Sequence, residues 1–328
     1  MNRIQYIDRI KGFAILLVVM GHVSVFCYHK GADSMDRFIG SFHMPLFMFL
    51  SGMVTKSNIS SHILFKTYGR KIGALLLPLI VFGFCFTLYC TGTSNIIEIP
   101  AKLWSFICSN NKMGYWYLFD LALFYALIPF YSLNKRNRWW IDVMIGVMIE
   151  TLFYIGWKPE NIFTDVMCLL NATSFYPFFI LGYIIRKYEV VAWLQSRDLV
   201  FPLSLIAYVF MLAFPFEEHI LHTLSWRFLM PVTGILTSLI FFANREKNDS
   251  WVENQLSFIG KHTLDVYVLH YFIISSINLT MVGKWLANTD NGFIATIFAI
   301  TPNGKLSSTT MTHFFVLSYI IITPFWNM

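Results

Sequence analysis

YIDRIKGFAILLVVMGHV, the stretch from Tyr6 to Val23, is apolar enough to enter a lipid bilayer, yet it carries several polar side chains. Asp8, Arg9 and Lys11 lie near its start, and His22 lies near its end. A helix turns about 100° and rises about 1.5 Å per residue, so Lys11 and His22 share one face about 16 Å apart, with Asp8 near the same stripe. Ionisable groups in membrane helices usually face a polar cavity or a partner. The stretch therefore predicts a membrane helix with a functional face.

A plainer interpretation of this stretch stays open. Lys11 can be an ordinary cytoplasmic flank of the helix, and His22 can be a packing histidine. Ile15 and Val18 lie between Lys11 and His22 on the same face. If the face is functional, we expect it to line a polar shaft, and a cysteine placed at Val18 to react with a water-soluble thiol reagent.

The composition of the whole chain fixes its broad class. Of the 328 residues, 56% are hydrophobic and only 13% are charged, against about a quarter charged residues in a typical soluble protein. We therefore expect an all-α, polytopic helical integral membrane protein. The net charge of +6 comes from basic residues in short loops between apolar runs, so it sets orientation in the membrane and does not indicate nucleic-acid binding.

Apolar runs suited to membrane helices of about 20 residues recur along the chain. The nine runs are residues 7–28, 38–54, 72–90, 115–131, 140–157, 175–185, 199–214, 228–243 and 264–279. A polar loop is expected from the third run to Asn111. Two short runs follow at 294–300 and 314–325, and one of them is taken to cross, which gives about ten helices. We expect residues 1–328 to form a single membrane domain, with the path of residues 283–328 left open.

Lysine and arginine counts orient these helices. With the N-terminus in the cytoplasm, the inside segments hold 16 of the 24 basic residues, the outside segments hold 7, and Lys305 falls in the tail. Cytoplasmic loops are enriched in lysine and arginine, so we expect a cytoplasmic N-terminus. The first apolar run lacks a small-residue cleavage site, so we expect it to remain as a helix and not to be removed as a signal peptide. The five cysteines form no CxxC pair, so we expect packing cysteines and no metal site.

Further polar residues interrupt the apolar runs. GYWYLFDLALFY, residues 114–125, places Trp116 and Asp120 one turn apart. Trp116 can be an interfacial belt residue, whereas a carboxylate inside a membrane helix needs a partner or water. LSFIGKHTLDVYVLHYFI, residues 256–273, carries Tyr267 and His270 one turn apart, and His270 can equally be a packing histidine. Glu150 and Arg227 are further charges that can pair structurally.

The chain resembles the membrane acyltransferase 3 family, with the fucose 4-O-acetylase-like O-acetyltransferases as the nearest branch. The resemblance covers about residues 5–282. It rests on IDRIKGFAILLVVMGH, FHMPLFMFLSG, WYLFDLALFY, FYPFFILGYIIRK and LSFIGKHTLDVYVLH, which begin at residues 7, 42, 116, 175 and 256. The family is described by an arginine, ten residues and a histidine in the first helix, and here the pair is Lys11 and His22. The resemblance implies that His22 is essential, that Lys11 is its basic partner, and that Ser51-Gly52 is the SG pair of the second helix. Lysine offers a point charge where arginine offers a bidentate fork.

The resemblance implies a bacterial inner-membrane O-acetyltransferase that is multi-pass and uses acetyl-CoA, or another short acyl-CoA, as co-substrate. No bound cofactor is expected. The expected partners are the lipid bilayer, the acyl-CoA and a glycan acceptor, with no nucleic acid, and the oligomeric state stays open. No appended SGNH-type hydrolase domain is recognised, so the membrane domain is expected to complete the transfer.

Acetyl transfer from a thioester to a hydroxyl needs a base, an oxyanion stabiliser and a dock for a polyanionic carrier. His22 is the candidate general base, or alternatively it carries the acyl group covalently. Lys11 with Arg70 and Lys71 can dock phosphate. The remaining candidates for binding substrate or acyl-CoA, among them possible oxyanion stabilisers, are Asp8, Ser51, Trp116, Asp120, Tyr267 and His270.

Two other function classes stay open on these residues. A proton-coupled transporter or a flippase of glycan or lipid intermediates would also place lysine, histidine and carboxylates within helices. No internal repeat with paired broken helices is evident, although many transporters have one. A structural membrane subunit would explain the packing motifs but not the charged stripe on the first helix.

Overall fold

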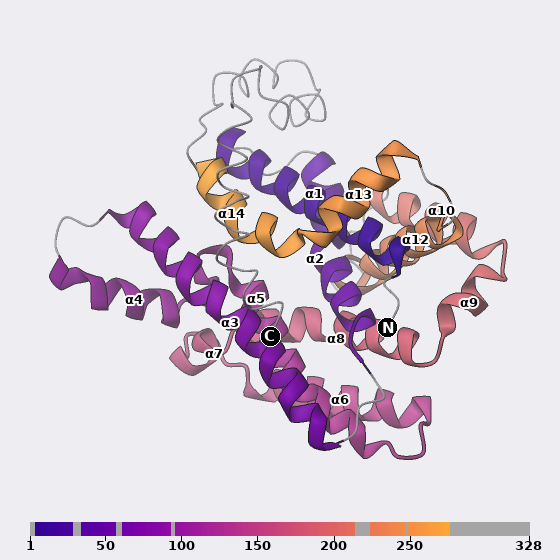
Figure 1. Ribbon diagram of the computed structural model, residues 1–328, viewed down its shortest axis with the longest axis horizontal. Coiled ribbons are helices and arrows are strands. Elements are labelled where there is room, and N and C mark those ends of the chain that lie inside the picture. The colour runs from indigo at the N-terminus through magenta and orange to yellow at the C-terminus, as the bar shows by residue number, and fades with distance from the viewer. Residues whose placement is uncertain are drawn as a thin grey trace. The chain divides into compact units, whose positions relative to one another are not determined.

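The computed structural model describes residues 4–28, 34–56, 61–92, 96–213, 224–246, 248 and 250–275, and all regular structure in these ranges is helical (Figure 1). This confirms the all-α class. Apolar runs form helices here because a helix satisfies its own backbone N–H and C=O groups, as the hydrocarbon of a bilayer requires. The described chain divides into two compact units, residues 1–46 with 197–328 and residues 47–196. The single-domain expectation remains a prediction.

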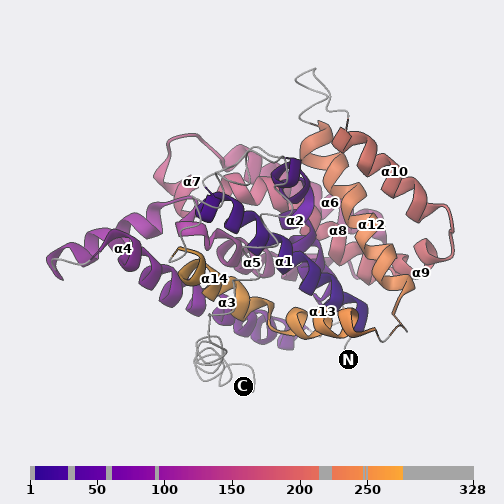
Figure 2. The ribbon, with the colours of Figure 1, turned by 90° about the horizontal axis from the view of Figure 1, so that it is seen from above.

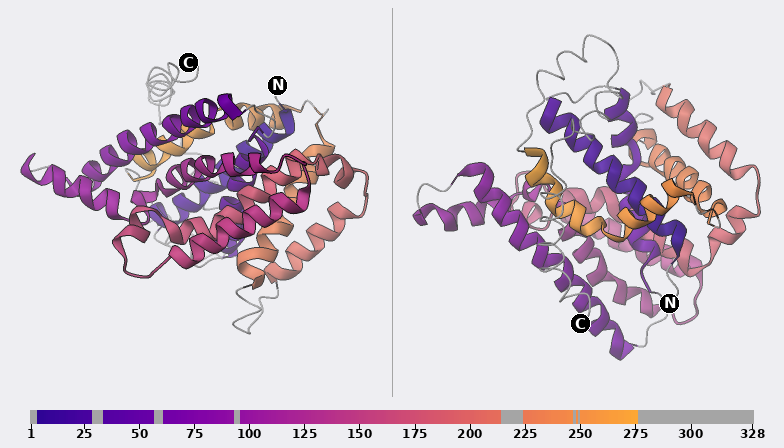
Figure 3. Two further views of the ribbon diagram at one scale, coloured as in Figure 1. Left: turned by 90° about the horizontal axis from the view of Figure 1, so that it is seen from below. Right: turned by 45° about the horizontal axis from the view of Figure 1, so that its top comes forward.

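Unit one is built on α1 (Gln5–Tyr28) and the first part of α2 (Ser34–Met53). From later in the chain come α10 (Val200–Ala213), the π-helical turn η4 (Ser225–Leu229), α12 (Met230–Asn244), α13 (Trp251–Lys261) and α14 (Thr263–Ser275). The helices α10 and α12 lie side by side (Figure 3), and Thr237 donates a 3.0 Å hydrogen bond to Ser204 between them. Helices from the two ends of the sequence thus share one core.

Glycines allow α13 to cross α1 in direct backbone contact (Figure 2). A Cβ on Gly12 would overlap the carbonyl oxygen of Leu256, and a Cβ on Gly260 would overlap that of Asp8. Small residues at helix crossings let backbones approach closely in membrane proteins. This crossing fixes the polar end of α1 against α13.

Unit two begins with the end of α2 and continues through α3 (Ser61–Thr91), η1 (Ile96–Glu98), α4 (Ile99–Cys108), η2 (Lys112–Gly114) and α5 (Trp116–Leu127). It ends with η3 (Ile128–Leu133), α6 (Trp139–Gly156), α7 (Ile162–Val166), α8 (Leu169–Lys187) and α9 (Val190–Gln195). Here too glycines mediate a close crossing, because a Cβ on Gly52 or Gly182 would overlap a carbonyl oxygen of α8 or α2, respectively. A buried ion pair joins α6 to α8, with Lys187 Nζ 2.6 Å from Asp142 Oδ2.

Five helices in the described ranges are long and apolar enough to cross a membrane: residues 5–26, 64–91, 116–133, 139–156 and 226–244. They fall on the first, third, fourth, fifth and eighth predicted runs. The apolar helices α10 and α14, on the seventh and ninth runs, are shorter. The runs at 294–300 and 314–325 lie outside the described residues, so the count of ten helices stays a prediction.

Two expected boundaries were wrong. The segment expected to be a polar loop up to Asn111 contains α4, whose sequence IPAKLWSFIC is largely apolar and has proline in its first turn, where the missing N–H costs nothing. The motif at residues 256–273 spans two helices, since α13 ends at Lys261 and α14 begins at Thr263, next to the predicted start of the ninth run at residue 264. The sixth run, predicted as 175–185, extends to Leu169–Lys187.

Candidate active site

His22 lies near the end of α1, partly buried, against two aromatic residues of α14. The Tyr271 hydroxyl is 3.1 Å from His22 Nε2, within hydrogen-bond distance. The ring centroid of His22 is 4.9 Å from that of Tyr271 and 5.1 Å from that of His270. Two imidazoles and a phenol therefore meet in unit one, between helices that are about 250 residues apart in sequence.

The helical spacing of α14 gathers three of these side chains. Tyr267, His270 and Tyr271 are one turn apart or adjacent, and the ring centroids of Tyr267 and His270 are 5.8 Å apart. His270 Nδ1 is 3.1 Å from the carbonyl oxygen of Val266. His270 is only 4% exposed, and its Nε2 has no hydrogen-bond partner among the described residues. The pairing of Tyr267 and His270 expected from sequence is present, and it lies beside His22.

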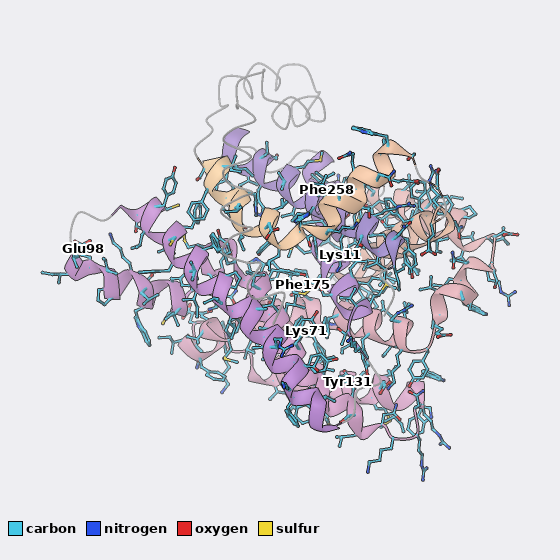
Figure 4. The ribbon with its side chains drawn as sticks, in the orientation of Figure 1. Lys11, Lys71, Glu98, Tyr131, Phe175 and Phe258 are labelled. Atoms are coloured by element: carbon cyan, nitrogen blue, oxygen red, sulfur yellow. The ribbon has the colours of Figure 1, made fainter. Side chains whose placement is uncertain are left out.

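The stripe on α1 between Lys11 and His22 is packed. Asp8 is buried and Lys11 is partly exposed, on the part of α1 that α13 crosses (Figure 4). Ile15 is 0% exposed and Val18 is 1% exposed. The expectation that Val18 lines an accessible polar shaft is therefore wrong for this structure, because both side chains between Lys11 and His22 on this face are buried.

Arg9 is a residue whose role the sequence did not show. The sequence marks it only as one of the basic residues near the start of the first helix, but its side chain is 1% exposed. Its guanidinium donates to the carbonyl oxygens of Arg245 at 2.7 Å and Asn248 at 2.6 Å, and lies 3.7 Å from Glu253. The local sequence does not distinguish Arg9 from Arg3. The fold shows that Arg9 holds the α12–α13 connection against α1 through these hydrogen bonds.

Glu253 also stabilises this connection, through ion pairs with Arg9 and Arg245. Arg245 Nε donates to its carboxylate at 2.8 Å. Burial alone would raise the pKa of Glu253, but the hydrogen bond from Arg245 and the charge of Arg9 outweigh it, so the pKa lies below its ordinary value. The carboxylate is therefore charged at neutral pH and pairs with both guanidinium groups.

Three sequence candidates lie in unit two on the helices α2 and α5. The Ser51 hydroxyl is 2.9 Å from the hydroxyl of Tyr117. Trp116 stacks on Phe175 of α8, with ring centroids 4.9 Å apart. Asp120 is 0% exposed, and neither carboxylate oxygen has a hydrogen-bond partner in the described ranges. Asp120 interacts electrostatically with the buried Lys112.

The two cations of α3 differ in their surroundings. Arg70 is exposed to solvent. Lys71, which Figure 4 labels on α3, is partly buried, with Nζ 4.6 Å from the ring centroid of Tyr125 and 5.6 Å from that of Tyr68. A lysine over aromatic rings gains cation–π energy. The dock formed by Lys11, Arg70 and Lys71 remains a prediction.

The structure thus brings His22, Tyr267 and His270 together in unit one, with Asp8 and Lys11 on the same helix as His22. Ser51, Arg70, Lys71, Trp116 and Asp120 belong to unit two. Within the described ranges, no group of three or more metal-ligating side chains is present, and the cysteines described there, Cys85, Cys90, Cys108 and Cys168, are free thiols. The roles of all these residues remain predictions.

Comparison with known proteins places this arrangement in a family. The family model Acyl_transf_3, described as an acyltransferase domain, matches residues 4–323. Similar curated proteins are the Nodulation protein NolL of Mesorhizobium japonicum, 27% identical over 230 residues, and the Nodulation protein NolL of Sinorhizobium fredii, 28% identical over 194 residues. These alignments cover 66% and 57% of this chain but only 58% and 50% of the relatives, so the chain spans about half of their length. No solved structure matches the chain. The chain belongs to the Acyl_transf_3 family and is a helical membrane protein built on an acyltransferase domain.

Proposed function

We propose that the protein is an O-acetyltransferase of the bacterial inner membrane. It moves an acetyl group from cytoplasmic acetyl-CoA to a hydroxyl of a cell-surface or lipid-linked glycan. His22 serves as general base or as acyl carrier. The observation that carries the proposal is the position of His22, within a membrane helix and against Tyr271 and His270, in a chain that matches an acyltransferase family along most of its length.

The chemistry fits a histidine in this position. As a base, neutral His22 takes the hydroxyl proton while the oxygen attacks the thioester carbon, and then returns the proton to the departing CoA sulfur. As a carrier, it attacks the thioester carbon first and expels the CoA thiolate, and the hydroxyl then takes the acetyl group while its proton goes to that thiolate. The Tyr271 hydroxyl at 3.1 Å holds the imidazole in one orientation in either case. Family membership favours acyl transfer over the transporter alternative.

A cytoplasmic donor fits the charge at the start of α1. We place the N-terminus in the cytoplasm from the lysine and arginine counts, so Lys11 lies at the cytoplasmic end of the helix and His22 about three turns deeper. CoA is a polyanion, and Lys11 supplies a cation for it at this end of α1. The glycan then reaches His22 from the outer side.

The test uses the purified full-length protein in detergent with acetyl-CoA. We expect the wild type to consume acetyl-CoA, by exchange or slow hydrolysis, and the His22→Ala variant to lose about 10²- to 10⁴-fold of that rate, the usual cost of removing a positioned base. Membrane abundance and thermal stability should be nearly unchanged.

His262→Ala is the matched control, because His262 lies in the same unit but is partly exposed and pairs with Asp265. It should keep most of the activity. Normal acetyl-CoA turnover by well-folded His22→Ala protein would rule out both proposed roles of His22.

A further inference from the structure

We propose that the acceptor carries two neighbouring hydroxyls, a 1,2-diol such as a sugar ring presents, and that His270 binds the hydroxyl that is not acetylated. The inference rests on the proposed function and names the class of acceptor. It makes His270 a residue that determines specificity, beside His22, which acts on the reacting hydroxyl.

The tautomer of His270 follows from its hydrogen bond. Nδ1 lies 3.1 Å from the carbonyl oxygen of Val266, and a carbonyl oxygen can only accept. Nδ1 must therefore carry the hydrogen, and Nε2 of the neutral ring carries a lone pair that needs a donor.

That lone pair is buried and has no partner among the described residues. His270 is 4% exposed, and Nε2 has no hydrogen-bond partner in the part of the chain that the structure describes. Leaving a buried acceptor unsatisfied costs about 1–3 kcal/mol, so such atoms are rare in proteins and call for an explanation. A ligand that donates a hydrogen bond to Nε2 supplies one.

The proposed reaction tells which ligand group can donate. Among the reacting groups, the acetyl thioester has no hydrogen-bond donor, and the reacting hydroxyl has a single proton, which goes to His22. The His22 and His270 rings lie 5.1 Å apart between centroids, so a group bound at His270 is close to the one bound at His22. A second hydroxyl on the carbon next to the reacting one meets both requirements.

The transfer step itself is unchanged by this second contact. With His22 as general base, the C–O bond to the reacting hydroxyl forms as the C–S bond breaks, and the proton passes through His22 to the thiolate of CoA. His270 stays neutral and only accepts a hydrogen bond. Its loss should therefore weaken use of a diol without abolishing turnover of acetyl-CoA.

The test offers three ring alcohols of similar size to the purified full-length enzyme with acetyl-CoA: cyclohexanol, cis-cyclohexane-1,2-diol and trans-cyclohexane-1,2-diol. Ester formation is followed by mass spectrometry. The wild type should esterify at least one diol about 10-fold faster than cyclohexanol, the range expected for one satisfied buried hydrogen bond. In His270→Phe the ratio of the diol rate to the cyclohexanol rate should fall to about one.

Two further variants separate recognition from folding. His270→Gln keeps an acceptor oxygen and should restore part of the diol preference. His262→Phe, on the other histidine of this segment, should keep the wild-type ratio. A merely structural role for His270 would lower all three rates together and leave the ratio unchanged.

Other outcomes overturn the inference. If the wild type esterifies the diols no faster than cyclohexanol, including no ester from any of them, His270 does not select a diol. A higher KM for acetyl-CoA in His270→Phe, with the diol ratio unchanged, would assign Nε2 to an amide of the CoA arm. Consumption of acetyl-CoA that depends on His22, measured in the same samples, tests the proposed function separately from the role of His270.

Discussion

At the residue scale, sequence and structure agree best around His22. The 3.6-residue period placed Lys11 and His22 on one face and Tyr267 near His270, and α1 and α14 are helical at all four residues. The period could not show that Tyr271 meets His22, because that contact joins two helices from opposite ends of the chain. The buried role of Arg9 was hidden for the same reason, since its partners are backbone carbonyls of a distant connection.

Lys11 carries a prediction at this scale. As a contact to the phosphates of the acyl-CoA, it should tolerate Lys11→Arg better than Lys11→Met, because the charge matters more than the shape of a point contact. Titration of the purified protein with acetyl-CoA should show weaker binding in Lys11→Met.

Lys135→Met is the matched control for Lys11, because Lys135 is exposed in the turn after η3 and is also expected on the cytoplasmic side. It should bind acetyl-CoA as the wild type does. An unchanged affinity in Lys11→Met would make Lys11 a topological flank only.

At the scale of elements, the sequence patterns located the helices that contain long apolar runs. The pattern missed α13 because Glu253, Asn254 and Gln255 interrupt its apolar residues. The packing of α13 explains why polar residues stand among its apolar ones. Glu253, Leu256 and Gly260, at helical spacing, meet α1, while Trp251 and Phe258 are exposed. Periodicity shows that such faces exist but not which neighbour each one meets.

The crossing of α13 over α1 gives a prediction at this scale. A Cβ on Gly260 would overlap the Asp8 carbonyl oxygen, which is backbone and cannot swing aside. Gly260→Ala should therefore push the two helices apart and cost about 1–3 kcal/mol, the usual range for overpacking. Thermal unfolding of the full chain in detergent measures the loss.

Gly40→Ala serves as the comparison, because nothing lies within 4 Å of a Cβ built on Gly40 of α2. Alanine is the better helix former by about 1 kcal/mol, so this variant should be as stable as the wild type or slightly more stable. Equal stability of Gly260→Ala and the wild type would show that the close crossing does not form.

At the scale of the whole molecule, composition alone predicted an all-α membrane protein, because so few charged residues cannot cover a soluble protein of this size. The described ranges contain five helices that satisfy length and apolarity, fewer than the nine runs counted in the sequence. The helix α8 shows how a boundary can differ, because it begins at Leu169, six residues before the run predicted at 175–185. Sequence patterns locate apolar segments well, but the ends of helices depend on packing that a single sequence does not show.

The central claim is that this chain acetylates a glycan by means of His22. Its most direct test is the acetyl content of the surface and lipid-linked glycans of the host, measured by NMR after deletion of the gene and complementation with wild type, His22→Ala or His262→Ala at equal membrane abundance. We predict that ester-linked acetyl groups disappear on deletion, return with the wild type and His262→Ala, and stay absent with His22→Ala. Restoration of the acetyl groups by His22→Ala, or an unchanged glycan after deletion, would contradict it.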